Sequence, residues 1–163
     1  MTTSARQATG ALGTDVPGGL LLHPVVIAAI ACFVINDHVF KPVHPGWLTG
    51  KLSDLAGLVF FPVLLAAVAE LVAPMVRRHT SALLVVAVAV TGLTYVAMLL
   101  LPPGADGYRW FVGFLQWPFR MIAAAVVGMP LPAIAPVRFA ADPTDLFTLP
   151  AFLVPLALAF WRR

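Results

Sequence analysis

Four long apolar stretches with few charged residues are the feature that most constrains what this chain can fold into. A helix needs about 20 mostly apolar residues to cross the hydrocarbon core of a bilayer. The stretches approach that length, at residues 20–36, 54–72, 81–101 and 145–161. The whole chain is 61% hydrophobic and 10% charged, whereas a soluble domain has about 25% charged residues. The sequence therefore predicts an all-α integral membrane protein, a helical bundle with four transmembrane helices.

A fifth predicted helix, residues 108–128, is ambiguous. It is apolar, but Arg109, Gln116 and Arg120 recur at helical spacing on one face. Either it lies in the interface or dips into the membrane and returns, or it crosses as a fifth transmembrane helix. With four spans, the arginines at positions 6, 77, 78, 162 and 163 all fall on one side, as is typical of a cytoplasmic face. We favour four spans plus one interfacial or re-entrant helix, with five spans as the alternative.

The domain organisation predicted from the sequence is simple. Residues 1–19 are small and polar, with several glycines, and should form a flexible N-terminal tail. Residues 20–163 should form a single transmembrane domain. Four of the ten Lys and Arg residues form two arginine pairs at the ends of apolar stretches, and no basic run is interleaved with aromatic residues. We therefore expect the lipid bilayer as the partner, and no nucleic acid.

Two similar phrases, Ser53-Asp54-Leu55 and Thr144-Asp145-Leu146, are predicted to open the second and fourth spans. Hydroxyl and carboxylate side chains cap free N–H groups at a helix start, and capping alone would explain them. Carboxylates near hydrocarbon are also costly, which makes them functional candidates. With four spans, both phrases would face one pocket at the same leaflet. The candidate catalytic residues are Asp54, Asp142, Asp145 and Lys51, although Lys51 is also placed to extend to the interface.

Candidate substrate-binding residues come from two places. One place is the polar face of helix 108–128, with Arg109, Gln116 and Arg120. The planar guanidinium groups of the two arginines would bind a phosphate or carboxylate, or the face would simply turn to lipid headgroups. His38 and His44 would lie at the rim of the site. The histidines and acids have the spacing of no strong metal motif, so we predict no metal and no cofactor.

Three phrases carry a resemblance: GKLSDLAGLVFFP at 50–62, QWPFR at 116–120 and DPTDL at 142–146. Together they resemble a family of small multi-pass bacterial membrane proteins without an assigned activity, over most of residues 36–155. That resemblance implies a bacterial plasma membrane location.

The layout is also similar to that of VanZ-like proteins, small polytopic proteins linked to glycopeptide-antibiotic resistance. These place a charged phrase before one span and an Arg…Asp phrase, here Arg138…Asp145, before the last span. Lys51 precedes Asp54, so the Asp-Lys-x-x-His order of those proteins is absent, and no asparagine follows Asp145. The likeness is therefore one of layout.

Three functions are compatible with this pattern. The first is a polar, charged site near one membrane face that handles a lipid or lipid-linked headgroup, including anionic headgroups. The second is a small transporter or channel subunit whose acids bind cations or protons. The third is a structural or assembly protein whose charges dock helices. The sequence leaves open whether the protein is an enzyme and what its oligomeric state is.

Overall fold

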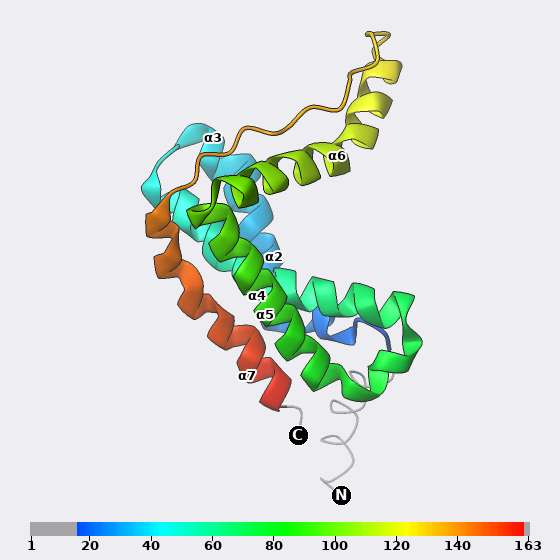
Figure 1. The fold of residues 1–163 in the computed structure, drawn as a ribbon, viewed down its shortest axis with the longest axis vertical. Coiled ribbons are helices and arrows are strands. Elements are labelled where there is room, and N and C mark those ends of the chain that lie inside the picture. The colour runs from blue at the N-terminus through cyan, green and yellow to red at the C-terminus, as the bar shows by residue number, and fades with distance from the viewer. Residues whose placement is uncertain (1–15, 162–163) are drawn as a thin grey trace, which may run out of the picture. The chain divides into compact units, whose positions relative to one another are not determined.

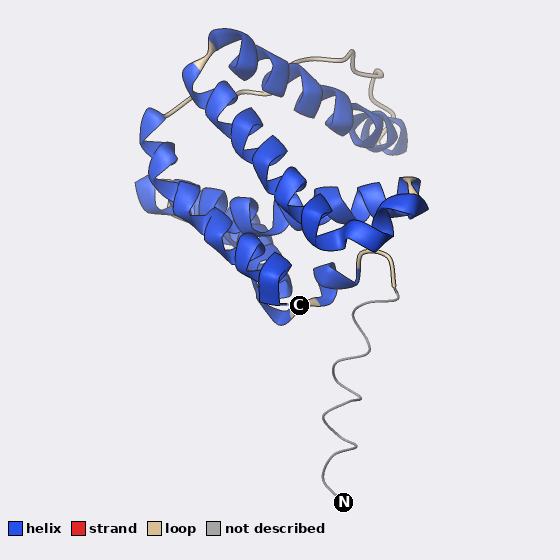
Figure 2. Cartoon of the chain, turned by 60° about the horizontal axis from the view of Figure 1, so that its bottom comes forward, coloured by secondary structure: helices blue, strands red, loops and turns tan. Residues whose placement is uncertain are grey.

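The computed structural model describes residues 16–161, except for the side chains of residues 77–79 and 161. Within that range the regular elements are all helices, and Figure 2 shows no strand among them. The chain divides into two compact units, each with its own packing. Unit 1 comprises Met1–Gly92 and Phe147–Arg163, and unit 2 comprises Leu93–Leu146. The all-α prediction is confirmed.

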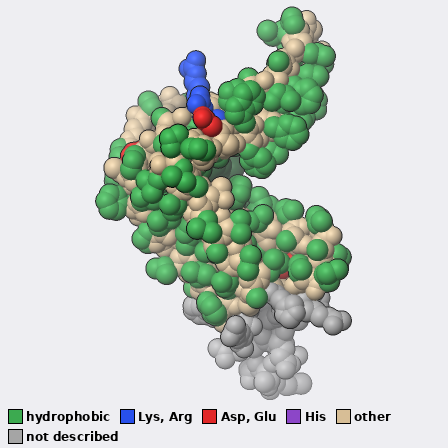
Figure 3. Space-filling model, viewed as in Figure 1, with side chains coloured by type: hydrophobic (Ala, Val, Ile, Leu, Met, Phe, Trp, Pro, Cys, Tyr) green, Lys and Arg blue, Asp and Glu red, His purple; other side chains and the backbone are tan. Residues whose placement is uncertain are grey.

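Among the described residues, four helical stretches are long and apolar enough to cross a membrane, as predicted. They are Pro24–Val43, Trp47–Val72, Thr80–Leu100 and Pro143–Phe160. Hydrophobic side chains are spread widely over the surface seen in Figure 3, and charged side chains are few there. This surface suits a lipid environment, because lipid tails are as apolar as the side chains that they would contact.

The first of these stretches is longer at its C-terminal end than predicted. Helix α2 (Pro24–Ile35) passes without a break into the π-helix η3 (Asn36–Phe40) and then into α3 (Lys41–Val43). The prediction that this helix ends near Asn36 was wrong. The polar side chains there bond to the next helix instead of terminating their own, so the backbone stays helical.

Helix α4 (Trp47–Val72) begins seven residues before the predicted start. Gly46 is its N-cap, and the Thr49 hydroxyl oxygen accepts a hydrogen bond from Gly46 N at 3.1 Å. Thr49 thus satisfies a backbone donor that has no partner within the helix. Pro62 lies inside α4 and is fully buried. Membrane helices tolerate such prolines.

Unit 1 has a tightly packed apolar core between α2, α4, the first part of α5 (Thr80–Leu100) and α7 (Leu153–Trp161) (Figure 1). Its most buried members, Val26, Val63 and Leu84, are at most 1% exposed. Small side chains such as Ala66 and Ala87 let the helices approach closely, and dispersion contacts then stabilise the packing. At Gly92, an added Cβ would come within 3.3 Å of the Phe152 ring.

The segment before α2 also packs on α4. The 3-10 helix η2 (Gly19–Leu22) follows Gly18, whose N–H donates to Glu70 Oε2 at 2.9 Å. Gly18 has φ +70°, a conformation that favours glycine. The side chains of Arg77 and Arg78, which follow α4, lie outside the described residues. Of the predicted tail, residues 1–15 also lie outside the described residues.

Unit 2 consists of the end of α5, helix α6 (Pro102–Val126), residues 127–142, which we call the return segment, and residues 143–146. One residue, Leu101, separates α6 from the end of α5. The return segment then runs back along α6 without regular structure (Figure 1). Helix α6 covers the ambiguous residues 108–126 and is not among the four helices with the length and apolarity of a span.

The return segment is held to α6 by specific contacts. Val137 N donates to Arg109 O at 3.0 Å, and Arg109 Nε donates to Val137 O at 3.2 Å. Farther along, Trp117 Nε1 donates to Pro132 O at 2.9 Å. The Ala135 carbonyl lies so close to Gly113 that a Cβ there would overlap it. The segment therefore ends beside the start of α6.

Candidate functional site

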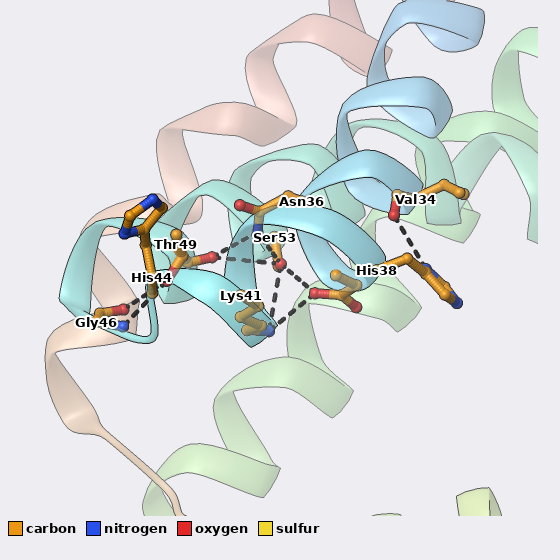
Figure 4. A network of polar contacts seen from close by, with 9 residues as sticks. Val34, Asn36, His38, Lys41, His44, Gly46, Thr49 and Ser53 are labelled. Carbon is orange, nitrogen blue, oxygen red and sulfur yellow. Dashed lines mark hydrogen bonds and ion pairs between the residues drawn. The ribbon is translucent and has the colours of Figure 1, made fainter.

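The densest polar contacts among the described residues lie where the π-helix η3 meets the first turns of α4 (Figure 4). We call these residues the α2–α4 polar cluster: Asn36, Asp37, Lys41, Thr49 and Ser53. Residue 36 follows α2 directly, and Lys41 comes one π turn later. π turns inside helices often occur at functional sites, and this makes the cluster a candidate functional site.

Ser53 lies at the centre of the cluster and is 5% exposed. Its hydroxyl donates to Asp37 Oδ1 at 2.6 Å. The same oxygen accepts from Asn36 Nδ2 at 2.6 Å and from Lys41 Nζ at 3.3 Å. Donor and acceptor capacity of the hydroxyl are thus both used. Ser53 therefore links the two helices, and its buried hydroxyl is already fully hydrogen-bonded within the cluster.

Asn36 is fully buried. Its Nδ2 also donates to Thr49 O at 2.6 Å, which fixes the orientation of the amide. The other end of the amide, Oδ1, has no donor among the described residues. A buried acceptor without a partner costs about 1–3 kcal/mol. A donor group from a bound molecule would therefore be favourable at this position.

The charged pair of the cluster is its accessible part. Lys41 Nζ lies 2.9 Å from Asp37 Oδ1, and the two side chains are 43% and 28% exposed. The spacing is i,i+4 on one helical face, and a partly exposed pair of this kind contributes about 0–1 kcal/mol to stability. The pair presents a cation and an anion next to each other at one end of two candidate spans.

Of the predicted catalytic residues, Lys51 and Asp54 lie close in sequence to the cluster. Lys51 is 6% exposed, and its Nζ lies 5.7 Å from the centroid of the Trp47 ring, within cation–π range. Asp54 is half-buried. The prediction that it opens a helix was wrong, because α4 starts at Trp47 and Asp54 lies about two turns inside it.

The predicted rim histidines are both exposed. His38 Nδ1 donates to Val34 O at 3.0 Å, and the ring points away from the cluster (Figure 4). The carbonyl of His44 accepts from Thr49 Oγ1 at 3.1 Å. His44 therefore contributes backbone to the start of α4, and neither ring contacts Asp37 or Lys41 in the bonds described.

The remaining predicted site residues lie in unit 2. Arg109 Nη1 pairs with Asp106 Oδ1 at 3.3 Å while its Nε holds the return segment. Arg120 Nη2 donates to Gln116 Oε1 at 2.9 Å, which confirms that these two side chains share a face. Both Gln116 and Arg120 are exposed.

The second acidic phrase begins a 3-10 helix, η5 (Pro143–Phe152), rather than a regular α-helix. Asp142 precedes this helix, and its Oδ1 accepts from Thr144 N at 2.9 Å. Asp142 is thus the capping side chain, and Asp145 lies in the first turn with its carbonyl accepting from Tyr95 Oη at 3.3 Å. Asp54 belongs to unit 1 and Asp145 to unit 2, so their common pocket stays a prediction.

Among the described residues, no three or more His, Cys, Asp or Glu side chains are grouped to hold a metal ion. An open pocket of about 310 Å³ lies between residues 16–22 and α4. Its lining, which includes Leu21, Leu64 and Leu71, has no polar side chain that would orient a ligand.

No member of the cluster was a predicted site residue, although Ser53 was named from the sequence as a possible cap. Asp37 and Lys41 have the i,i+4 spacing of a helical ion pair, and that signal was available. The turn-type residues Pro42, Pro45 and Gly46 obscure that signal, because they are typical of a loop. The bonds from Asn36 to Thr49 and Ser53 join different helices, so no local pattern indicates them.

Comparisons with protein-family models, with curated proteins and with solved structures found no match to this chain. The resemblance of its three phrases to small multi-pass bacterial membrane proteins, and the VanZ-like layout, stay predictions.

Proposed function

We propose that this multi-pass membrane protein binds the headgroup of a phospholipid or lipid-linked molecule at the α2–α4 polar cluster. The observation that carries the proposal is the Lys41–Asp37 pair, half-exposed at the end of two apolar helices and held by buried Ser53. Trp47, which is 67% exposed, begins α4 at the same end. Tryptophan is enriched at the level of lipid headgroups, which supports headgroup depth for the cluster.

The chemistry of the pair favours a headgroup with both a phosphate and a nearby donor. Lys41 has three N–H donors, and the bonds to Asp37 and Ser53 use two of them. The third suits a phosphate oxygen. The described bonds to Asp37 use Oδ1, and Oδ2 suits an ammonium or hydroxyl group. Phosphatidylethanolamine and sugar-linked lipid phosphates both have this arrangement.

Lipid retention tests the proposal. The protein is placed in nanodiscs of phosphatidylcholine, phosphatidylethanolamine and phosphatidylglycerol, and retained lipid is measured by native mass spectrometry. Lys41→Gln should reduce retained phosphatidylethanolamine about tenfold, because a hydrogen bond to a charged group contributes about 1.5 kcal/mol or more. Arg138→Gln makes the same charge change at an exposed residue of unit 2 and should have no such effect. Equal retention by Lys41→Gln and wild type would contradict the proposal.

A second variant separates binding from a purely structural role. Asp37→Asn removes the partner for an ammonium group, so it should reduce retention of phosphatidylethanolamine but not of phosphatidylglycerol. If Asp37→Asn and Lys41→Gln lower thermal stability without changing the retained lipid, the cluster only docks α2 on α4. Predicted catalytic roles for Asp54, Asp142, Asp145 and Lys51 would require a turnover assay with the lipid identified in this way.

Buried Glu70 favours a second candidate function, transport of cations or protons. It is 6% exposed inside the candidate span α4, and acids at such positions are often functional. Its bond to Gly18 N supports a structural role instead. Ion flux into liposomes that disappears in Glu70→Gln would favour transport, since that variant keeps the hydrogen-bond acceptor and removes only the charge.

A further inference from the structure

Helix α6 has a continuous apolar face that unit 2 leaves uncovered. Six large hydrophobic residues at helical spacing on this face are each at least 50% exposed: Trp110, Phe111, Phe114, Leu115, Phe119 and Ile122. Four of the six are aromatic. The polar residues Arg109, Gln116 and Arg120 lie on the other side of the helix, where Arg120 bonds to Gln116. Helix α6 is therefore strongly amphipathic, unlike the four candidate spans.

The return segment lies against α6 beside its polar face. It contacts α6 through Arg109, Gly113 and Trp117, which follow one another at about one-turn spacing. Near the start of the helix, the Tyr108 and Phe139 rings contact each other in a tilted arrangement with centroids 4.9 Å apart. From Arg109 to Trp117, the segment and the exposed apolar face therefore occupy different sides of the helix.

The backbone of the return segment argues against a transmembrane position for α6. Among residues 130–141, the backbone–backbone hydrogen bond that the structure shows is Val137 N to Arg109 O. Prolines 130, 132 and 136 have no N–H, but the other peptide groups need partners. In hydrocarbon each unpaired group costs several kcal/mol, whereas interfacial water satisfies it. If α6 crossed the bilayer, the segment beside it would have to cross as well.

We infer that α6 lies in the plane of the membrane–water interface, with its aromatic face inserted in lipid and Arg109 and Arg120 at the headgroups. Chain connections support lipid as the occupant of that face. One residue, Leu101, separates α6 from the apolar helix α5, and the return segment leads directly into the candidate span that begins at Pro143. Both ends of this unit are therefore connected to the ends of candidate spans, where the interface lies. In addition, aromatic residues on one face and arginines on the other are typical of in-plane helices.

Spin labels along the apolar face test this placement. In full-length Cys32→Ser protein, labels are placed one at a time at Phe111, Leu115 and Ile122, and the protein is reconstituted in phosphatidylcholine–phosphatidylglycerol vesicles. Depth is measured from accessibility to oxygen and to a water-soluble nickel chelate. The outer labels are 11 residues apart, which is about 16 Å along a helix. An in-plane helix should give one depth at all three positions, and Gln116→Cys should be accessible to the chelate.

Every other outcome overturns the inference. A steady change of depth by about 16 Å would show a spanning helix. Low accessibility to both reagents would show that protein covers the face, and high chelate accessibility would show that it lies in water. Labels at Val86, Val90 and Leu93, exposed positions of α5, are the matched control and should show the steady change. The result is independent of lipid retention at Lys41, so failure of one proposal leaves the other intact.

Discussion

Ser53 determines whether the polar cluster holds together, because its hydroxyl bonds to Asn36, Asp37 and Lys41 at once. Ser53→Ala leaves buried Asn36 with fewer acceptors and removes a donor from Asp37. We expect the free energy of unfolding to fall by about 1–3 kcal/mol, measured by denaturant titration in mild detergent. Ser81→Ala makes the same change in α5 at a residue with no described hydrogen bond and should stay within about 0.5 kcal/mol of wild type. Equal effects of the two substitutions would contradict the assigned role.

Glu70 supports a second residue-scale prediction. Glu70→Gln keeps an acceptor for Gly18 N–H, whereas Glu70→Leu removes it. Hydrogen exchange at Gly18 should accelerate about tenfold in Glu70→Leu, because a lost hydrogen bond of about 1.4 kcal/mol corresponds to that factor. Exchange in Glu70→Gln should be close to wild type. If both variants accelerate exchange equally, the charge of Glu70 rather than its hydrogen bond holds the segment before α2.

At the residue scale, the sequence indicated which types of side chain matter but not which of them meet. Apolar context made Asp54 and Lys51 conspicuous. The cluster instead depends on Asn36 and Ser53, whose bond joins residues 17 positions apart. Such a contact follows from the packing of two helices, and the packing of small side chains is not visible in a single sequence.

At the element scale, two glycines of α6 provide a matched pair. A Cβ at Gly113 would overlap the Ala135 carbonyl, whereas a Cβ at Gly107 would meet nothing within 4 Å. Gly107→Ala should increase stability by up to about 1 kcal/mol through helix propensity. Gly113→Ala should decrease it by about 1–3 kcal/mol through overpacking, and proteolysis should then cleave residues 130–141 faster. Equal stability of the two variants would show that the return segment does not pack on α6.

The elements were predictable to the extent that hydrophobicity alone defines them. Apolar length located all four candidate spans, because lipid selects for it directly. Helix starts were predicted poorly, because Thr49-Gly50 and Pro42 look like turn residues yet lie in helices. Prolines 130, 132 and 136 account for the irregular backbone of the return segment, but its path along α6 depends on Gly113 and Trp117, which lie some 15–22 residues away in the chain.

At the scale of the whole chain, the number of crossings determines which charged residues share a compartment. Within unit 2, the return segment ends beside Arg109 at the start of α6. After α6 the chain therefore returns to the point where that helix began, so α6 and the return segment together add no net crossing. This supports an even number of crossings for the whole chain. Four candidate spans then place residue 163 on the same side as residues 77–78. That side holds four of the ten Lys and Arg residues as two arginine pairs, and such pairs favour the cytoplasm.

Reporter fusions test this topology. Alkaline phosphatase, active only outside the cytoplasm, and green fluorescent protein, fluorescent only inside it, are fused after residues 46, 79 and 163 in turn. We expect fluorescence after residues 79 and 163 and phosphatase activity after residue 46, because one span separates 46 from 79 and an even number separates 79 from 163. Phosphatase activity after residue 163 would mean that α6 crosses the membrane as a fifth span.

Replacing Arg77 and Arg78 by glutamine should make the orientation of the chain in the membrane less uniform, since short basic loops near span ends determine which side stays inside.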